Sequence, residues 1–327
     1  MAEIFQQGVD VSRYQGQIDW RKVKAAGQQY AIIRAVSSSK TGPYIDPFFQ
    51  EHIQQAQAAG LRVGAYYYTY ALNEQQAIAE LELVLEALQG LKLEYPVFVD
   101  MEDSSIAALG RQAATNLARF ALVVLDQKGW YSGLYTYTSF AQNNLDMSQL
   151  QEWPLFIADY RGFVGYPGRY DMWQFSSTGR VDGISTNTDL SYSYTDFLPR
   201  IIEGGYNGFE PLPTMIPLNN TQLEVFATNT EYFNGPDVND IQGRLPIGFY
   251  PALTRSTGSY NGFEWVTFLF NGQEYWTALL DDRTRLVAGN DCCAQLEEAL
   301  LQLEEKDAII NATAQQLRQL ADDLENG

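Results

Sequence analysis

The feature that most constrains the fold of this chain is a repeated alternation of short apolar segments with helix-like segments between Phe5 and about Arg200. Such alternation predicts β/α units around a parallel sheet, and eight strands are enough to close the sheet into a barrel. The last three gaps between strands are too short or too rich in glycine for good helices, so we expect an α/β barrel with an irregular final third. The predicted strands are Gly8–Val11, Tyr30–Val36, Arg62–Tyr70, Tyr95–Met101, Tyr131–Tyr137, Pro154–Tyr160, Asp171–Ser176 and Thr188–Ser191, and the predicted helices are Asp19–Ala26, Pro47–Ala59, Glu74–Leu88 and Arg111–Lys128.

Two carboxylates stand at the tip of one predicted strand, in the string Pro96–Glu102. Asp100 and Glu102 are two positions apart, and alternation along a strand sends both side chains to the same face. Each acid raises the cost of ionising the other, so one carboxyl keeps its proton near neutral pH while its neighbour is charged. The pair therefore predicts an acid catalyst at the carboxyl end of a barrel strand.

Further acids and aromatic residues fall at the ends of the other predicted strands. Aromatic rings stack on the C–H faces of sugars, and carboxylates bind sugar hydroxyls. The pattern favours a sugar substrate, although each tyrosine taken singly fits equally well as filling of the barrel core. These residues are Asp10, Tyr66, Tyr68, Asp100, Glu102, Tyr135, Tyr137, Asp159, Trp173 and Asp189.

Composition excludes several other functions. The chain has 40 acidic and 21 basic residues and a formal net charge of −19, so there is no basic surplus to neutralise phosphates and we expect no nucleic-acid partner. Its one histidine, His52, lies among polar residues of a helix-like run and is interpreted as a surface or capping residue, which leaves catalysis to carboxylates. Cys292 and Cys293 are adjacent and form neither a disulfide framework nor a spaced metal site, and we expect no metal and no cofactor.

The sequence also shows no signal peptide and no membrane-spanning segment. No run approaches the roughly 20 apolar residues that a membrane span needs, and no basic stretch precedes an apolar core with a cleavage site near the N-terminus. We therefore expect no membrane insertion, and synthesis in the cytoplasm without a signal peptide.

A second unit is predicted after the barrel, which we place at residues 1–203. Glycine and proline in residues 204–217 predict a linker. Residues 218–288 carry only β signals and predict a small β-barrel module, with a clear hairpin of Glu264–Phe270 and Glu274–Leu280 turned by Asn271-Gly272.

The last segment, residues 290–327, predicts a helix. A coiled coil needs apolar residues at two positions of each heptad. At one of these positions apolar residues recur every seven residues and form a strong seam, whereas the residues at the other position are mixed. The helix either forms a coiled coil that makes a homo-oligomer through residues 294–325 or docks alone on the body of the protein. The residues of the strong seam are Leu296, Leu303, Ile310, Leu317 and Leu324.

Taken together and in this order, several motifs make the first 200 residues resemble the glycoside hydrolase family 25 lysozymes. The resemblance covers the whole predicted barrel. Its carriers are Gly8-Val9-Asp10-Val11-Ser12 with Tyr14-Gln15-Gly16, Ala31-Ile32-Ile33-Arg34-Ala35, Asp46-Pro47, Ala59-Gly60-Leu61 with Val63-Gly64-Ala65-Tyr66, Asp100-Met101-Glu102, Trp173-Gln174-Phe175 and Asp189-Leu190.

The resemblance implies a modified (β/α)5(β)3 barrel that cleaves the β-1,4 bond between N-acetylmuramic acid and N-acetylglucosamine in peptidoglycan. It implies that Glu102 is the general acid and Asp100 its partner. Asp10 and Asp189 would flank the site and bind or polarise the substrate. Tyr66 and Trp173 would form walls of the subsites. Our full set of candidate substrate-binding residues is Tyr14, Arg34, Tyr66, Tyr68, Tyr135, Asp159 and Trp173.

The stereochemical outcome stays open at the level of sequence. Residues i and i+2 of a strand lie roughly 6.5–7 Å apart, a separation from which flexible carboxylates can serve a retaining or an inverting reaction. We favour a third route, in which the acetamido group of the substrate attacks while Asp100 orients it. Two departures from the family pattern, Val36-Ser37-Ser38-Ser39 after the second strand and Ser191 in the last motif, concern substrate preference.

Other functions compete with this one. The module at 218–288 resembles, more faintly, bacterial SH3-type wall-binding modules, and the alternative for it is a spacer or assembly role. A chitinase-like hydrolase also has Asp-x-Glu at a strand tip, but it carries a further acid where this chain has Phe98. A non-catalytic glycan-binding or structural tail component is the non-enzymatic alternative. The leading hypothesis is a phage-type lysin that acts at the bacterial cell wall after release.

Overall fold

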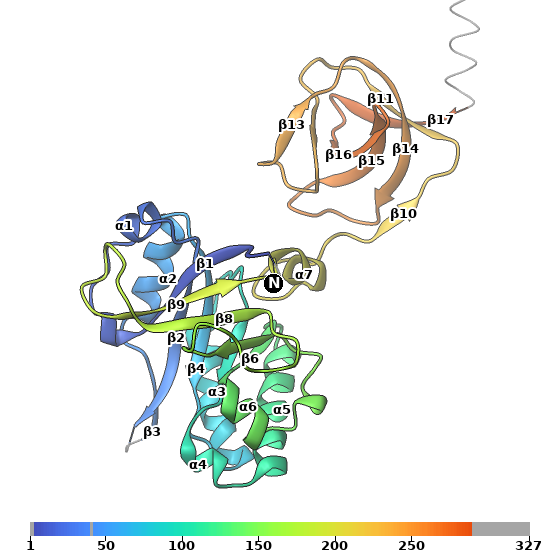
Figure 1. Cartoon of the computed structure of the whole chain (residues 1–327). Helices are drawn as coiled ribbons and strands as arrows, with labels where there is room; N and C mark the ends of the chain where they lie inside the picture. Colours follow the sequence, from blue (N-terminus) through green and yellow to red (C-terminus); the bar gives the residue numbers. More distant parts are fainter. Residues whose placement is uncertain (1–2, 40–41, 290–327) are drawn as a thin grey trace, which may run out of the picture. The chain divides into compact units, whose positions relative to one another are not determined.

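The computed structural model describes residues 3–39 and 42–289. The chain divides into two compact units, one ending at Pro211 and the other beginning at Leu212, and each is described by itself (Figure 1). The first unit is an α/β barrel, and the second unit is built from β-strands.

The first unit is a closed barrel of eight strands with a β-hairpin added to its second strand. Neighbours run parallel from β1 through β2, β4, β5, β6 and β7 to β8, whereas the last strand is antiparallel to both β8 and β1 and joins them. The strands are β1 (Gln6–Val11), β2 (Tyr30–Ser39), β4 (Arg62–Tyr68), β5 (Val97–Asp100), β6 (Ser132–Tyr137), β7 (Leu155–Ala158), β8 (Met172–Gly179) and β9 (Thr188–Ser193), and the hairpin strand is β3 (Gly42–Ile45).

Five of the barrel strands are followed by helices that cover the outside of the barrel, so the expected (β/α)5(β)3 architecture is confirmed. One expectation was wrong: a helix, α6, follows β6, in a gap that we thought too short for one. The five helices are α1 (Trp20–Ala25), α2 (Phe49–Ala58), α3 (Glu74–Leu88), α5 (Arg111–Gln127) and α6 (Thr138–Asn144), and the short elements are η1 (Arg13–Gln15), α4 (Ser104–Ala107), η2 (Met147–Gln149) and α7 (Leu198–Gly204).

Alternation along the strands divides the core into two layers. Outward-facing residues such as Val9 and Val97 pack against the helices in the larger cluster, while Tyr30, Phe98 and Phe156 fill the interior of the barrel. This aromatic filling needs space from the neighbouring strands: a Cβ on Gly133 would lie 2.6 Å from the Phe98 ring. The barrel is therefore a packed core whose polar residues are displaced towards the carboxyl ends of its strands.

The helix α7 follows β9 and closes the amino end of the barrel interior. Phe197 and Ile201 belong to the same buried cluster as Tyr30 and Phe98. The ring of Phe197 meets Tyr95 edge-on with 5.4 Å between ring centroids. Phe197 is 2% exposed, so this end of the barrel is sealed by hydrophobic contact.

The structure places His52 in the interior, so its interpretation as a surface or capping residue was wrong. His52 is 1% exposed and lies on the buried face of α2 with Phe49 and Ile53. The indole N–H of Trp20 donates to His52 Nδ1 at 3.4 Å, and the ring of Phe48 stacks on the imidazole. Burial lowers the pKa of His52, and the residue packs helix α2 against α1 rather than serving a reaction.

The second unit is an antiparallel sheet whose strand order is β13-β12-β16-β15-β14-β11-β17, with β10 paired to β14. The predicted hairpin is present: β15 and β16 are joined by Asn271 and Gly272, which both have positive φ as a type I′ turn requires. Trp265 is fully buried in it. The strands are β10 (Met215–Pro217), β11 (Thr221–Val225), β12 (Glu231–Phe233), β13 (Ile241–Arg244), β14 (Gly248–Ser256), β15 (Glu264–Phe270), β16 (Gln273–Leu279) and β17 (Thr284–Ala288).

Two of the expectations from sequence concern the segments just before and just after this unit, namely the linker and the C-terminal helix. Strand β10 lies inside residues 204–217, which we expected to be a linker, because Met215–Pro217 pairs with the far end of β14. The predicted helix at 290–327 and its heptad seam lie outside the described residues. Across residues 3–39 and 42–289, no helix is both long and apolar enough to span a membrane.

We expect Phe197→Ala to destabilise the barrel unit by about 3 kcal/mol, because a buried aromatic ring is lost from the seal at its amino end. Urea unfolding of the full chain followed by far-UV circular dichroism measures this change. Phe163→Ala removes the same ring from a site that is 60% exposed and should change the free energy of unfolding by less than about 0.5 kcal/mol. Equal effects of the two variants would contradict the proposed role of α7.

Candidate active site

A cavity of about 270 Å³ opens at the carboxyl ends of the barrel strands. It brings together four of the five acids singled out at the strand ends, Asp10, Asp100, Glu102 and Asp189. Five of the predicted substrate-binding residues also line it: Tyr14, Arg34, Tyr66, Tyr68 and Tyr135. The remaining lining residues are Val11, Ser12, Gln15, Ile32, Phe98, Phe156, Tyr160 and Gln174.

Asp10 and Asp189 are brought together by the strand pair that closes the barrel. They are directly opposite residues of β1 and β9. Asp10 is 5% exposed, and its Oδ2 accepts hydrogen bonds from Gln174 Nε2 at 3.0 Å and from the hydroxyl of Ser191 at 3.2 Å. Burial, and then the charge of Asp189, raises the pKa of Asp10 well above its ordinary value, and burial raises the pKa of Asp189 to about 6.

Asp100 and Glu102 come from the end of β5, where the backbone between them is fixed. The amide of Met101 donates to the carbonyl of Tyr135 at 2.9 Å, and the hydroxyl of Thr136 donates to the carbonyl of Met101 at 2.6 Å. Burial, and then the charge of Glu102, raises the pKa of Asp100. Burial, followed by the charges of Asp189 and Asp103, raises the pKa of Glu102. The site therefore keeps carboxylic protons at a pH where an isolated carboxyl has lost its proton.

Arg34 supplies positive charge beside this cluster and is held by a buried ion pair. Its Nε and Nη2 lie 2.9 and 2.8 Å from Asp46 Oδ2. The arginine lowers the pKa of Asp100, against the larger effect of burial. Since Asp46 occupies one edge of the guanidinium, Arg34 is oriented before any substrate arrives.

Gln174, in the motif Trp173-Gln174-Phe175, has a part in the site that was not predicted. Its Oε1 accepts hydrogen bonds from the hydroxyls of Tyr135 at 2.9 Å and Tyr160 at 2.6 Å, and its Nε2 donates to Asp10. These three bonds fix which end of the amide faces Asp10. A glutamine on a strand facing the barrel interior was the available signal, since such an amide needs several partners when it is buried.

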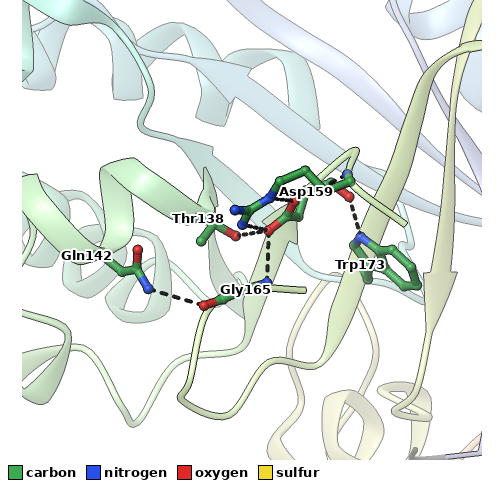
Figure 2. A network of polar contacts seen from close by, with 6 residues as sticks. Thr138, Gln142, Asp159, Gly165 and Trp173 are labelled. Carbon is green, nitrogen blue, oxygen red and sulfur yellow. Dashed lines mark hydrogen bonds and ion pairs between the residues drawn. The ribbon is translucent and has the colours of Figure 1, made fainter. Parts of the chain in front are cut away.

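Asp159 and Trp173, both predicted to bind substrate, do not line this cavity. The carboxylate of Asp159 turns to its own loop, where it pairs with Arg161 and accepts from the hydroxyl of Thr138 at 2.7 Å and the amide of Gly165 at 2.9 Å (Figure 2). Hydrogen bonding from Arg161 lowers the pKa of Asp159. The indole N–H of Trp173 donates to the carbonyl of Asp159 at 2.8 Å. Both residues shape the loop after β7.

The donor set of the site suits sugar hydroxyls and protons better than a metal ion. Among the described residues, no group of three or more His, Cys, Asp or Glu side chains is arranged to hold a metal. Tyrosine rings stand beside the acids on β4, β6 and the loop after β7, where they offer stacking faces.

An eight-stranded barrel with paired carboxylates and tyrosines at its carboxyl end is suited to the chemistry of a glycoside hydrolase. Residues 9–184 match the model of the glycosyl hydrolases family 25. The chain belongs to this family, as the sequence motifs indicated.

Individual relatives agree with this assignment. The chain is 31% identical over 210 residues to a protein of Clostridium acetobutylicum named autolytic lysozyme, a match that covers 62% of this chain and 59% of that protein. This chain therefore spans less than two thirds of the length of that relative.

Solved structures share the fold. The structure of the CTP1L endolysin matches with a TM-score of 0.51 and 24% identity, over 60% of this chain and 69% of that one. The spore cortex lytic enzyme SleM of Clostridium perfringens matches with a TM-score of 0.52 and 18% identity, over 86% of this chain and 98% of that one. The barrel unit is less than two thirds of this chain, so the second match extends into the β module.

The raised pKa of Asp189 predicts how stability depends on pH. The folded state holds this proton up to about pH 6, whereas the unfolded chain loses it near the ordinary value of 3.8, so the stabilisation is complete at low pH and is lost as pH rises through 6. We expect Asp189→Asn to flatten this fall and to be more stable than wild type at pH 7 by on the order of 2 kcal/mol. Urea unfolding between pH 4 and 7.5 measures both curves.

Asp182→Asn is the matched control, because Asp182 is an exposed aspartate of the loop between β8 and β9. Its curve should follow wild type at every pH. If Asp189→Asn also followed wild type, burial would not be holding a proton on Asp189.

Proposed function

We propose that this protein is a peptidoglycan hydrolase, a 1,4-β-N-acetylmuramidase that cleaves the bond between N-acetylmuramic acid and N-acetylglucosamine. Membership of family 25 and similarity to a protein named autolytic lysozyme support this activity. The observation that carries the proposal is the meeting of Asp100 and Glu102 with Asp10 and Asp189 in one cavity lined by tyrosines.

Glu102 is the general acid in this proposal. Its raised pKa keeps the carboxyl protonated closer to neutral pH than that of an ordinary glutamate. The proton passes to the glycosidic oxygen as the bond from that oxygen to C1 of muramic acid breaks, and N-acetylglucosamine leaves with a free hydroxyl. Positive charge then develops at C1 and the ring oxygen, and the carboxylates that remain ionised stabilise it.

Asp100 orients the acetamido group of muramic acid, whose carbonyl oxygen attacks C1 from the opposite face. Asp100 Oδ1 is buried and has no hydrogen-bond partner among the described residues, so it is free to accept the acetamido N–H. The group closes on C1 as a five-membered ring, and water then opens this ring at C1. Two displacements at the same carbon restore the original configuration, as this substrate-assisted route requires.

We expect Glu102→Gln to lower the rate of peptidoglycan digestion at least about 10³-fold, because the amide cannot supply the proton. Purified peptidoglycan is digested, and products are identified by mass spectrometry before and after borohydride reduction. Reduced muramic acid ends from wild type, and their loss in the variant, would support the proposal. Glu82→Gln, at an exposed position of α3, is the control and should digest at the wild-type rate.

Other outcomes favour the alternatives. Reduced N-acetylglucosamine ends would make the enzyme a glucosaminidase, and cleavage of chitin strands in preference to peptidoglycan would favour a chitinase-like hydrolase. No products from wild type would favour a glycan-binding or structural barrel. Inversion of configuration, seen by proton NMR of the products in early turnover, would contradict the role of Asp100.

The rest of the chain has proposed roles that follow from the same substrate. We propose that the protein acts at the bacterial cell wall as a lysin. We also propose that the β module, which we predicted at residues 218–288 and compared with SH3-type modules, binds the wall. Net negative charge would be repelled by anionic wall polymers. Binding by the module would therefore rest on stacking and hydrogen bonds and would survive added salt.

We also propose that residues 294–325 assemble the protein into a homo-oligomer. Light scattering coupled to size exclusion measures the number of protomers in the full chain and in a version ending at Gly289. The full chain is expected to contain more protomers than the shortened version, since a coiled coil joins one copy to another. Equal protomer numbers in the two proteins would contradict this assembly.

A further inference from the structure

A second cavity, of about 470 Å³, lies next to the catalytic one. The two share Tyr14, Arg34 and Tyr68 as lining residues, so a ligand can extend from one into the other. We call the second cavity the tyrosine–arginine pocket; its lining residues are Arg13, Tyr14, Arg34, Ser37, Ser38, Tyr44, Tyr68 and Tyr70.

The charge of this pocket comes from Arg13. Its guanidinium carbon lies 5.3 Å from the ring centre of Tyr14 and 5.0 Å from that of Tyr44. In the part of the chain that the structure describes, its guanidinium has no carboxylate within ion-pair distance. Apart from the two arginines, the described residues of the lining are neutral. Arg13 is thus a positioned cation at the edge of a site that is otherwise rich in acids.

Both oxygens of the nearby Asp46 carboxylate already accept hydrogen bonds from other groups, and neither forms an ion pair with the guanidinium of Arg13. Its Oδ2 pairs with Arg34 and also accepts the backbone N–H of Arg13 at 3.0 Å, and its Oδ1 accepts the backbone N–H of Phe48 at 3.0 Å. Asp46 therefore fixes the backbone of Arg13 while leaving the guanidinium available. An arginine held in this way is suited to bind a carboxylate through paired N–H donors.

The opposite wall of the pocket is built before any ligand binds. Glu80, which is 4% exposed, accepts hydrogen bonds from the backbone N–H of Tyr70 at 3.0 Å and from the hydroxyls of Ser38 at 2.9 Å and Thr69 at 2.6 Å. The rings of Tyr68 and Tyr70 lie 4.7 Å apart. Glu80 of α3 thus fixes the ends of β2 and β4, which supply the residues of this wall.

We propose that the tyrosine–arginine pocket binds the carboxylate on the 3-O substituent of the muramic acid residue, with Arg13 as the group that recognises the carboxylate and the tyrosines as its walls. The inference rests on the proposed muramidase function. Those acids of the catalytic cavity that are ionised repel an anion, so a substrate carboxylate is favoured where Arg13 stands. N-Acetylglucosamine has no carboxylate, and the pocket therefore distinguishes the two sugars of the strand.

The test compares glycan strands whose carboxylates are intact with the same strands after conversion of the carboxylates to methylamides. We expect wild type to prefer the intact strands about tenfold in kcat/KM, and Arg13→Gln to lose this preference, as expected for one charge-assisted contact. Arg13→Lys should keep part of it. Arg21→Gln removes the same charge from an exposed position of α1 and should keep the full preference. An equal preference in wild type and Arg13→Gln would overturn the proposal.

Two substrates distinguish whether Arg13 binds the lactyl carboxylate of muramic acid or a carboxylate of the stem peptide. Strands freed of stem peptides by an amidase expose the lactyl carboxylate, whereas intact strands carry the carboxylates of the peptide. A larger effect of Arg13→Gln on peptide-free strands assigns the lactyl group, and a larger effect on peptide-bearing strands assigns the stem. Either result supports recognition of a carboxylate at Arg13.

A binding measurement keeps this inference separate from the proposed reaction. Calorimetric titration of the full-length Glu102→Gln protein with N-acetylmuramic acid, and with its methylamide, needs no turnover. Tighter binding of the free acid, lost when Arg13→Gln is added, supports the pocket even if wild type cleaves nothing. Equal affinity for the acid and the methylamide would overturn the pocket even if the enzyme is a muramidase.

Discussion

The antiparallel pairing of β1 with β9 is the interaction on which the barrel unit depends. The run of parallel strands from β1 to β8 has two free edges until β9 joins them, and unpaired edges expose backbone groups. The same pairing sets Asp10 directly opposite Asp189. Closure of the sheet and assembly of the acidic site are therefore a single structural event, so the backbone geometry that makes the barrel continuous also concentrates negative charge at one of its ends.

That concentration of charge is offset by contacts arranged around it. Gln174 and Ser191 donate to Asp10, and Arg34 opposes the charge near Asp100. One oxygen of each acid, Asp10 Oδ1 and Asp100 Oδ1, is nevertheless buried without a hydrogen-bond partner among the described residues. Stability is supplied elsewhere, by the aromatic filling of the barrel and by the packing of helices on its outer face. A protein that separates its stable core from an acid-rich site in this way follows a common division between stability and activity.

Much of the barrel was predictable because its strands and helices have clear periodicity, and the acids at the strand ends follow from that pattern. The direction in which a side chain points after the end of a strand could not be predicted in the same way. Asp159 follows its strand as the acids of the cavity follow theirs, yet Arg161 and the amide of Gly165 hold its carboxylate in its own loop.

The remaining differences have the same physical origin. Helix α6 is too short for its periodicity to be read from sequence, and its place is set by packing of Phe140 and Ala141 in the outer core. His52 was expected at the surface because its sequence neighbours are polar, but the turn of α2 directs it inward beside Trp20. The bonds of Gln174 join strands far apart in sequence. Such contacts depend on the closed tertiary structure and leave no local pattern.

The order of the acids along the chain has a consequence for timing. Asp10 lies in the first strand of the barrel and Asp189 in the last, and α7, which seals the amino end, is made later still. A ribosome adds these parts in sequence, so a nascent chain lacks one wall of the site until nearly the whole unit has been synthesised. A product that terminates before β9 likewise lacks that wall. The chain thus gains its complete site only when its own barrel is finished.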